Sequence, residues 1–190
     1  EDGLADVLAQ RHPNRAQDLT PAEVEHARAF LANFRSIFTV NYDLLLYWVV
    51  NRTEAGHPDV SKRDGFEWLT ADGPFDLVWK SKPTQGSQLI FYLHGALHYF
   101  RASTDRRLHK LAYSISEPLI DQVRARIEGG EYPTIVTEGR SDEKVAAIER
   151  NPNLRHAHDH LRRASGVLFI HGMSLSPNDG HILKLVESPD

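Results

Sequence analysis

The sequence contains no cysteine among its 190 residues. This absence excludes disulfide bonds, thiolate nucleophiles and every zinc or iron–sulfur site built on cysteine ligands. Disulfides belong to oxidising compartments, so a chain without cysteine fits a reducing one. We therefore expect a cytoplasmic location.

Long apolar runs and an excess of one charge are also missing. The longest run, residues 44–50, is far shorter than the roughly 20 residues that a membrane-spanning helix needs. There are 22 Lys and Arg residues against 26 Asp and Glu, the net charge is −4, and the basic residues are scattered. A protein that binds a phosphate backbone carries a basic patch instead. We expect neither a membrane nor a nucleic acid as partner.

What is present is an ordinary globular composition, 41% hydrophobic and 25% charged. We assign residues 1–190 to a single domain. A capping box at Thr20-Pro21-Ala22-Glu23 predicts a helix that runs to about Phe34. The remaining predicted helices cover residues 44–51, 118–128, 141–150 and 153–164 and start again near 178, and the predicted core strands cover 37–40, 89–93, 134–137 and 167–170.

Strands that alternate with helices predict an α/β fold with a mostly parallel sheet and flanking helices. Two stretches, 52–88 and 99–130, interrupt this alternation with aromatic, glycine-rich and proline-rich pieces. We expect inserted hairpin and helix elements there.

Two polar clusters directly follow apolar runs, namely Asn41-Tyr42-Asp43 and His94-Gly95. In an open parallel sheet, ligands bind at the carboxyl ends of the strands. The structural interpretation is that Asn41 tolerates a turn, Asp43 caps a helix and His94 is a satisfied core residue. The functional interpretation is that Asn41 orients a sugar hydroxyl or a water, Asp43 supports it, and His94 exchanges protons near neutrality.

A third cluster, Gly172-Met173-Ser174-Leu175, lies between an apolar run and a helix. Backbone N–H groups and a helix N-terminus at such a place bind anions, although an ordinary βα turn has the same sequence character.

A metal site is disfavoured, because Gly95 stands where the His-x-x-x-His zincin motif requires Glu. The histidines at 156, 158 and 160 are better explained as a solvated helix face.

Together, the segments Thr39–Asp43, Leu93-His94-Gly95, Gly172-x-Ser174-Leu175 and Asp179-x-His181-Ile182 resemble the sirtuin-like superfamily, above all its bacterial branches. The resemblance extends over about residues 36–186 and implies a Rossmann-like sheet that binds NAD. It implies that Asn41 and His94 are catalytic at the nicotinamide ribose, with Asp43 in support. The cofactor contacts that it implies are Thr39, Gly95, Gly172, Ser174, Leu175 and Asp179.

The chain departs from this family in two respects. It cannot build the four-cysteine zinc module of the sirtuin deacylases, so the resemblance favours NAD cleavage without a metal over deacylation. The opening strand and glycine-rich pyrophosphate loop of the superfamily have no counterpart before the first helix. We therefore expect an incomplete fold that lacks its first βα unit.

The sequence leaves three functional hypotheses open. The first is an NAD glycohydrolase with a role in bacterial defence, acting on a small-molecule nucleotide. The second is a sensor that binds NAD or an ADP-ribose derivative without turnover, and the third is a structural fragment. A homo-oligomer or an attached regulatory segment, and NADP in place of NAD, also stay open.

Overall fold

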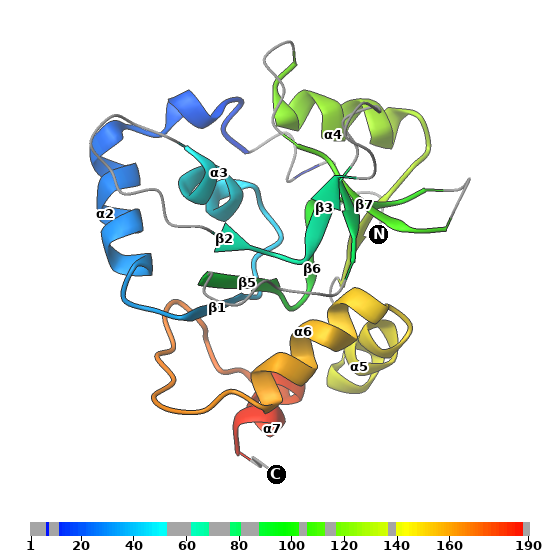
Figure 1. The fold of residues 1–190 in the computed structure, drawn as a ribbon. Coiled ribbons are helices and arrows are strands. Elements are labelled where there is room, and N and C mark those ends of the chain that lie inside the picture. The colour runs from blue at the N-terminus through cyan, green and yellow to red at the C-terminus, as the bar shows by residue number, and fades with distance from the viewer. Residues whose placement is uncertain are drawn as a thin grey trace.

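The computed structural model describes residues 7, 12–52, 62–68, 77–80, 88–102, 106–112, 117–136 and 140–187. Its helices are α2 (Pro21–Leu31), α3 (Leu45–Asn51), α4 (Leu119–Glu128), α5 (Ser141–Glu149), α6 (Pro152–Arg162) and α7 (Gly180–Glu187), with 3₁₀ turns η1 (Ala16–Asp18) and η2 (Pro177–Asp179). Its strands are β1 (Ser36–Thr39), β2 (Lys62–Arg63), β3 (Phe66–Trp68), β4 (Leu77–Trp79), β5 (Gln88–Tyr92), β6 (Gly95–Arg101), β7 (Leu108–Lys110) and β8 (Pro133–Ile135). Figure 1 shows their arrangement.

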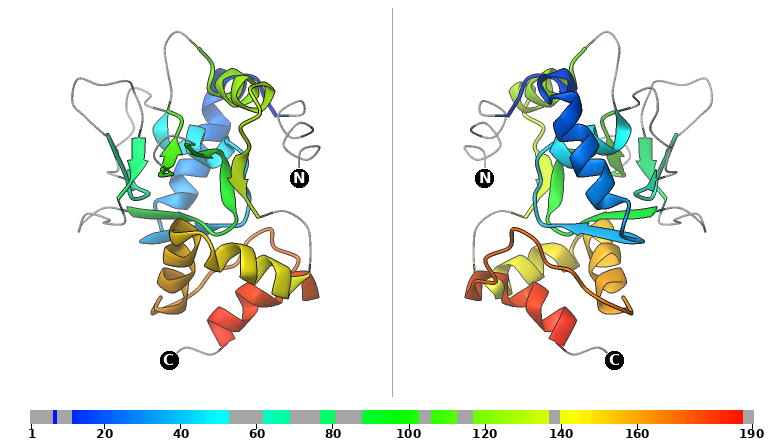
Figure 2. Two further views of the ribbon diagram at one scale, coloured as in Figure 1. Left: turned by 90° about the vertical axis from the view of Figure 1, so that its right-hand side faces the viewer. Right: turned by 90° about the vertical axis from the view of Figure 1, so that its left-hand side faces the viewer.

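The first sheet is parallel and has the strand order β1-β5-β2. In the register of β1 and β5, Ser36 pairs with Leu89 and Thr39 pairs with Tyr92. Helices α2 and α3 lie on one side of this sheet, and α6 and α7 lie on the other (Figure 2). The carboxyl ends of β1 and β5 are therefore neighbours.

Strand β5 is buried on both faces. Ile90 and Tyr92 pack into a core with α3 and the second sheet, whereas Phe91 and Leu93 pack against α6 and α7. A parallel strand covered on both sides requires a continuous apolar sequence, because neither face meets water. This explains why the run at 89–93 does not alternate with polar residues.

The second sheet is antiparallel, with the order β3-β4-β7-β6-β8. Strand β6 begins at Gly95, directly after the turn that ends β5. Gly95 has φ +79°, and a Cβ at this position would lie 1.9 Å from the carbonyl oxygen of Thr134. Only glycine lets β8 approach β6 so closely.

The predicted α/β class and every predicted helix from residue 20 onwards are confirmed. Thr20 accepts a hydrogen bond from the N–H of Glu23, and Glu23 accepts one from the N–H of Thr20, which is the expected capping box. The stretch 99–130 holds a hairpin of β6 and β7 and then α4, as expected, and the described parts of 52–88 hold β2, β3 and β4. Of the described helices, none has the length and apolar content needed to cross a membrane.

Two predicted strands of the parallel sheet are wrong. The one expected at 134–137 is β8, which pairs antiparallel with β6 and so joins the second sheet; residue 137 lies outside the described residues. The one expected at 167–170 is not a strand: Val167 is 100% exposed, and Phe169 is 58% exposed. An apolar run forms a strand only where a neighbouring edge satisfies its backbone, and among the described strands none pairs with it.

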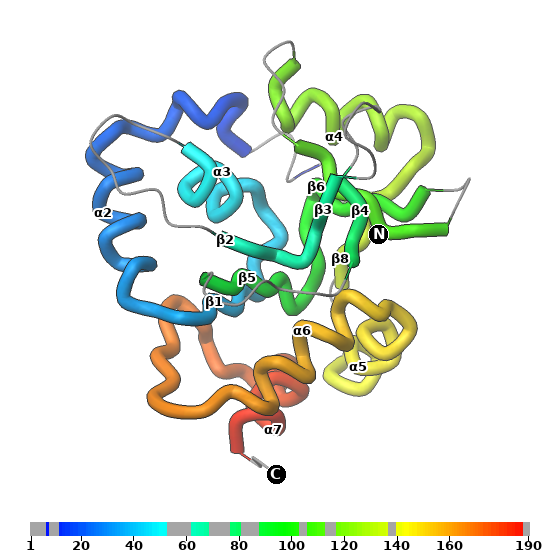
Figure 3. Tube along the Cα trace, viewed as in Figure 1, coloured from blue at the N-terminus to red at the C-terminus, as the bar shows by residue number. Residues whose placement is uncertain are grey.

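The exposed run, drawn in orange, lies beside β1 and the end of α2 (Figure 3). Its one aromatic side chain, Phe169, lies 5.9 Å from the rings of both Phe30 and Phe34. Further along, Met173 packs against the core between the parallel sheet and α7. The segment is thus attached to the domain at a few points while most of its apolar surface faces solvent.

Candidate functional site

The loop after β1 is organised by short-range hydrogen bonds. The N–H of Asn41 donates to Oγ1 of Thr39 at 3.0 Å, and the N–H of Leu45 donates to Oδ1 of Asp43 at 2.9 Å. Asp43 therefore satisfies one free N–H at the start of α3, as the structural interpretation expected. Asn41 itself is exposed.

Asn41 and His94 lie at the same edge of the parallel sheet. Each follows by two residues a member of the terminal β1–β5 pair, Thr39 and Tyr92. The N–H of Leu93 donates to the carbonyl of Thr39 at 2.8 Å, which continues the pairing beyond the strands. Neighbouring strands lie about 4.8 Å apart, so the backbones at these two positions are close, while Asn41 is exposed and His94 is buried.

His94 is buried and forms a pair with His181 at the start of α7. The two Nε2 atoms are 2.8 Å apart, and the ring planes are within 20° of each other with centroids 5.0 Å apart, as an in-plane hydrogen bond requires. Only 6% of His94 and 4% of His181 is exposed. A third buried histidine, His158 of α6, donates from Nε2 to the carbonyl of Leu93 at 3.0 Å, and its ring lies nearly parallel to that of His181 with centroids 6.1 Å apart.

This cluster holds its imidazoles in the neutral form. Burial, followed by the neighbouring His181 and Lys144, lowers the pKa of His94 to about 3. Burial, followed by His158 and Lys144, lowers the pKa of His181 to about 4. Both rings are therefore uncharged at neutral pH, and one of them donates a hydrogen bond to the other.

Two helix N-termini meet beside this pair. The N–H of Val136 donates to the carbonyl of His94 at 2.8 Å, just before the connection to α5. The first residue of α5, Ser141, has its Oγ 3.7 Å from where a Cβ on Gly180, the first residue of α7, would lie. Helix N-termini attract anions, and here carboxylates of the chain already occupy them: Asp142 and Glu143 lie in the first turn of α5, and Asp179 directly precedes α7.

An ion pair links the same two helices. Nζ of Lys144 lies 3.8 Å from Oδ1 of Asp179, and both side chains are largely buried. Asp179 also accepts a hydrogen bond from Ser176 at 3.3 Å. Asp179 is thus close enough to His94 to raise its pKa, although less than burial lowers it.

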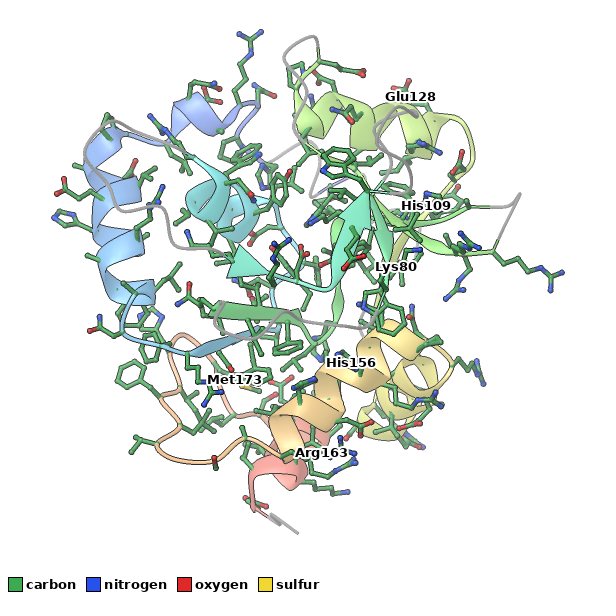
Figure 4. The ribbon with its side chains drawn as sticks, viewed as in Figure 1. Lys80, His109, Glu128, His156, Arg163 and Met173 are labelled. Carbon is green, nitrogen blue, oxygen red and sulfur yellow. The ribbon has the colours of Figure 1, made fainter. Side chains whose placement is uncertain are left out.

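The third predicted cluster is not brought to the histidine pair by any contact among the described residues. Gly172, Ser174 and Leu175 are exposed, and Gly172 has φ +68° with open space around its Cα. Leu175 also has a left-handed backbone, with φ +53°. Only Met173, between them, packs inward, from the same side of the sheet as His156 (Figure 4).

Gly95 has a structural explanation in the close approach of β8, so its predicted contact with a cofactor stays a prediction.

The histidines of α6 do not simply form a solvated helix face, as the sequence predicted. His160 stacks on Phe91 at 4.6 Å, and His158 is buried. Groups of three or more His, Asp or Glu side chains arranged to hold a metal are absent from the described part of the chain.

A cavity of about 580 Å³ lies away from these residues, between α3 and the second sheet. Tyr47, Trp48 and Trp68 form its aromatic wall, and Lys110 also lines it. Lys110 is bound to Asp64 at 2.5 Å, so its charge is already compensated. None of the predicted site residues lines this cavity.

The sequence interpretation missed His181 and His158 as members of the site. The sequence marks His181 only through the Asp179-x-His181 pattern, and it is 87 positions from His94. For His158 a signal existed: with Leu154 and Leu161 it lies on the apolar face of α6, at helical spacing.

The chain belongs to the DUF4917 family, described as a domain of unknown function, and the match covers residues 1–190. A search of the curated proteins found no match.

Proposed function

We propose that this domain binds NAD at the carboxyl edge of its parallel sheet and cleaves the bond between nicotinamide and ribose. The observation that carries the proposal is the placement of Asn41 and His94 just beyond paired residues of β1 and β5. The motif resemblance to the sirtuin-like superfamily supports NAD as the nucleotide. As part of the same proposal, we regard the parallel sheet as Rossmann-like.

The departure of nicotinamide needs little help from the protein. When the C1′–N1 bond breaks, its electron pair passes to the ring nitrogen, and the cationic pyridinium becomes neutral nicotinamide. The difficulty lies in the electron-poor ribose and in the water that must form the new C1′–O bond. A positioned amide and a neutral imidazole serve these two needs.

Asn41 would orient the ribose hydroxyls or the attacking water through its carboxamide. His94 would accept the proton that the water loses. Its Nε2 is engaged with His181, so Nδ1 is the nitrogen left for the substrate.

A sensor without turnover is the second candidate, and one observation favours it. A histidine with a pKa of about 3 is a weak base, because burial and its neighbours disfavour the imidazolium. The same pocket would then hold NAD intact. Isothermal calorimetry followed by analysis of the ligand after long incubation separates the two candidates, because a sensor returns NAD unchanged.

The test of the main proposal is nicotinamide release from NAD by the full-length protein. Asn41→Ala and His94→Ala should each slow release by about 100-fold or more, the usual effect of losing a positioned catalytic group. Release that is unchanged in both variants contradicts the assignment. The matched control is His26→Ala on α2, which removes an exposed imidazole outside the site and should leave release at the wild-type rate.

A further inference from the structure

The pairing of His94 with His181 constrains where the hydrogens of both rings lie. A neutral imidazole carries one N–H and one bare nitrogen. The two Nε2 atoms are at hydrogen-bond distance, 2.8 Å, so one and only one of them carries the hydrogen between them. The tautomer of either ring therefore decides the tautomer of the other.

Two arrangements satisfy this condition. In the first, His94 donates from Nε2, leaves its own Nδ1 bare, and requires a hydrogen on Nδ1 of His181. In the second, His181 donates from Nε2, and His94 carries its hydrogen on Nδ1. Only the first arrangement gives His94 a lone pair that can accept a proton from water at Nδ1.

The surroundings of His181 favour the first arrangement. Its Nδ1 is buried and makes no hydrogen bond of normal geometry within the described part of the chain, so a hydrogen on it is favoured only if an acceptor lies nearby. The backbone of Asn178 raises the pKa of His181, which is the effect of an acceptor on an N–H. The carbonyl of Asn178 also accepts a hydrogen bond from Lys144 at 3.3 Å, so it faces these polar groups.

The third histidine does not compete for this hydrogen. A carbonyl oxygen can only accept, so the bond from His158 to Leu93 fixes the hydrogen of His158 on Nε2. Its ring lies nearly parallel to that of His181, with the centroids 6.1 Å apart. His158 is therefore a suitable control, because it belongs to the cluster but stays outside the shared hydrogen bond.

We infer that His181 is a positioning residue that holds His94 in the tautomer with a bare Nδ1, ready to accept a proton from the substrate side. The inference depends on the proposed function for its catalytic meaning. The geometry is that of a nucleophile or base oriented by a partner on its far nitrogen, a role that a carboxylate often fills. Here an imidazole fills it, and the site stays uncharged.

Long-range ¹H–¹⁵N spectra of the ligand-free protein at pH 7.5 test the tautomer directly. We expect Nδ1 of His94 to be bare in the wild type, in His158→Gln, and in His181→Gln, where the amide oxygen still accepts from Nε2 of His94. In His181→Leu, which removes the acceptor, the hydrogen should redistribute between the two nitrogens of His94. A hydrogen on Nδ1 in the wild type, or an unchanged His94 in His181→Leu, overturns the inference.

Nicotinamide release provides the second readout. His181→Leu should lower kcat by about 100-fold with little change in KM, and His181→Gln should recover most of the loss. A kcat equal to the wild type in His181→Leu overturns the positioning role while His94→Ala still tests the proposed function. If the wild type releases no nicotinamide, the proposed function fails, and the spectra alone decide the tautomer. Thermal unfolding of each variant shows whether the fold is retained.

Discussion

The chain contains two apolar runs that end in His-Gly, and they have opposite fates. Residues 89–93 form β5 and its end, and lead to the buried His94 and to Gly95. Residues 167–170 lead to the exposed His171 and to Gly172, and they form no strand. Similar local sequence thus yields a central strand in one place and an exposed segment in the other.

The difference is made by neighbours and not by propensity. Strand β5 has β1 and β2 at its two edges and a packed core on each face. The run at 167–170 touches α2 through Phe169, and among the described residues no strand pairs with it. A candidate site built on the first run therefore has a rigid base, which the second run lacks.

The largest difference in unfolding free energy is expected between substitutions of the two glycines, Gly95 and Gly172. Gly95→Ala should destabilise the protein by at least about 4 kcal/mol, because its Cβ would overlap the Thr134 carbonyl at a left-handed φ. Gly172→Ala should cost only about 1 kcal/mol, since the strain is the same but the space is open. Urea unfolding measures both. Equal costs would show that the two turns are equally packed.

The next comparison uses one phenylalanine from each apolar run. Phe91→Ala should cost about 3–5 kcal/mol, the usual loss for a buried aromatic ring. Phe169→Ala should cost less than about 1 kcal/mol, because the ring is 58% exposed. If Phe169→Ala is as damaging as Phe91→Ala, the run at 167–170 is buried in solution and the contrast is wrong.

The buried histidine pair should give a pH effect of intermediate size. His94 and His181 have folded pKa values of about 3 and about 4, below the ordinary 6.5, so the unfolded chain binds more protons between these limits. Stability should be complete above pH 6.5 and fall as the pH drops toward the folded values, by about 2 kcal/mol at pH 5 for one such histidine.

Unfolding free energies at pH 7.5 and 5 measure this effect. The double variant His94→Gln and His181→Gln should lose part of the pH dependence, and the remainder would come from the other buried histidines, such as His98. A double variant with the full dependence of the wild type would contradict the account.

The smallest effect is expected at the second His-Gly. His171→Gln should change the stability by no more than about 0.5 kcal/mol and leave nicotinamide release unaltered, because His171 is exposed and contacts only the Phe30 ring among the described aromatic contacts. The matching change, His94→Gln, tests the buried counterpart. Equal activity in the two variants would remove the distinction between the segments.

Much of the fold follows from local sequence signals. The capping box at Thr20, the break between the predicted helices 141–150 and 153–164, and the apolar run of β5 each place an element correctly, because caps and burial act over a few residues. Residues 134–137 and 167–170 have the same apolar character, but their pairing depends on distant edges. No local sequence pattern indicates with which strand edge a segment will pair.

The candidate site also has a part that local sequence predicts and a part that it does not. Asn41 and His94 could be predicted because both follow a strand, and parallel strands end at one edge. The pairing with His181 could not, since it depends on how α7 packs against α6 and β5 through Phe91, Leu161 and Leu185. The environment that sets the pKa of His94 is therefore a property of the packing and not of the motif.

The claim that Asn41 and His94 serve one bound sugar can be tested by titrating the full-length protein with ADP-ribose. Two-dimensional NMR would follow the side-chain amide of Asn41 and the ring of His94 in the same experiment. We expect both signals to shift with a common Kd, while the indole signal of Trp68 in the separate cavity stays in place. A shift at only one of the two residues, or at neither, would contradict a shared site.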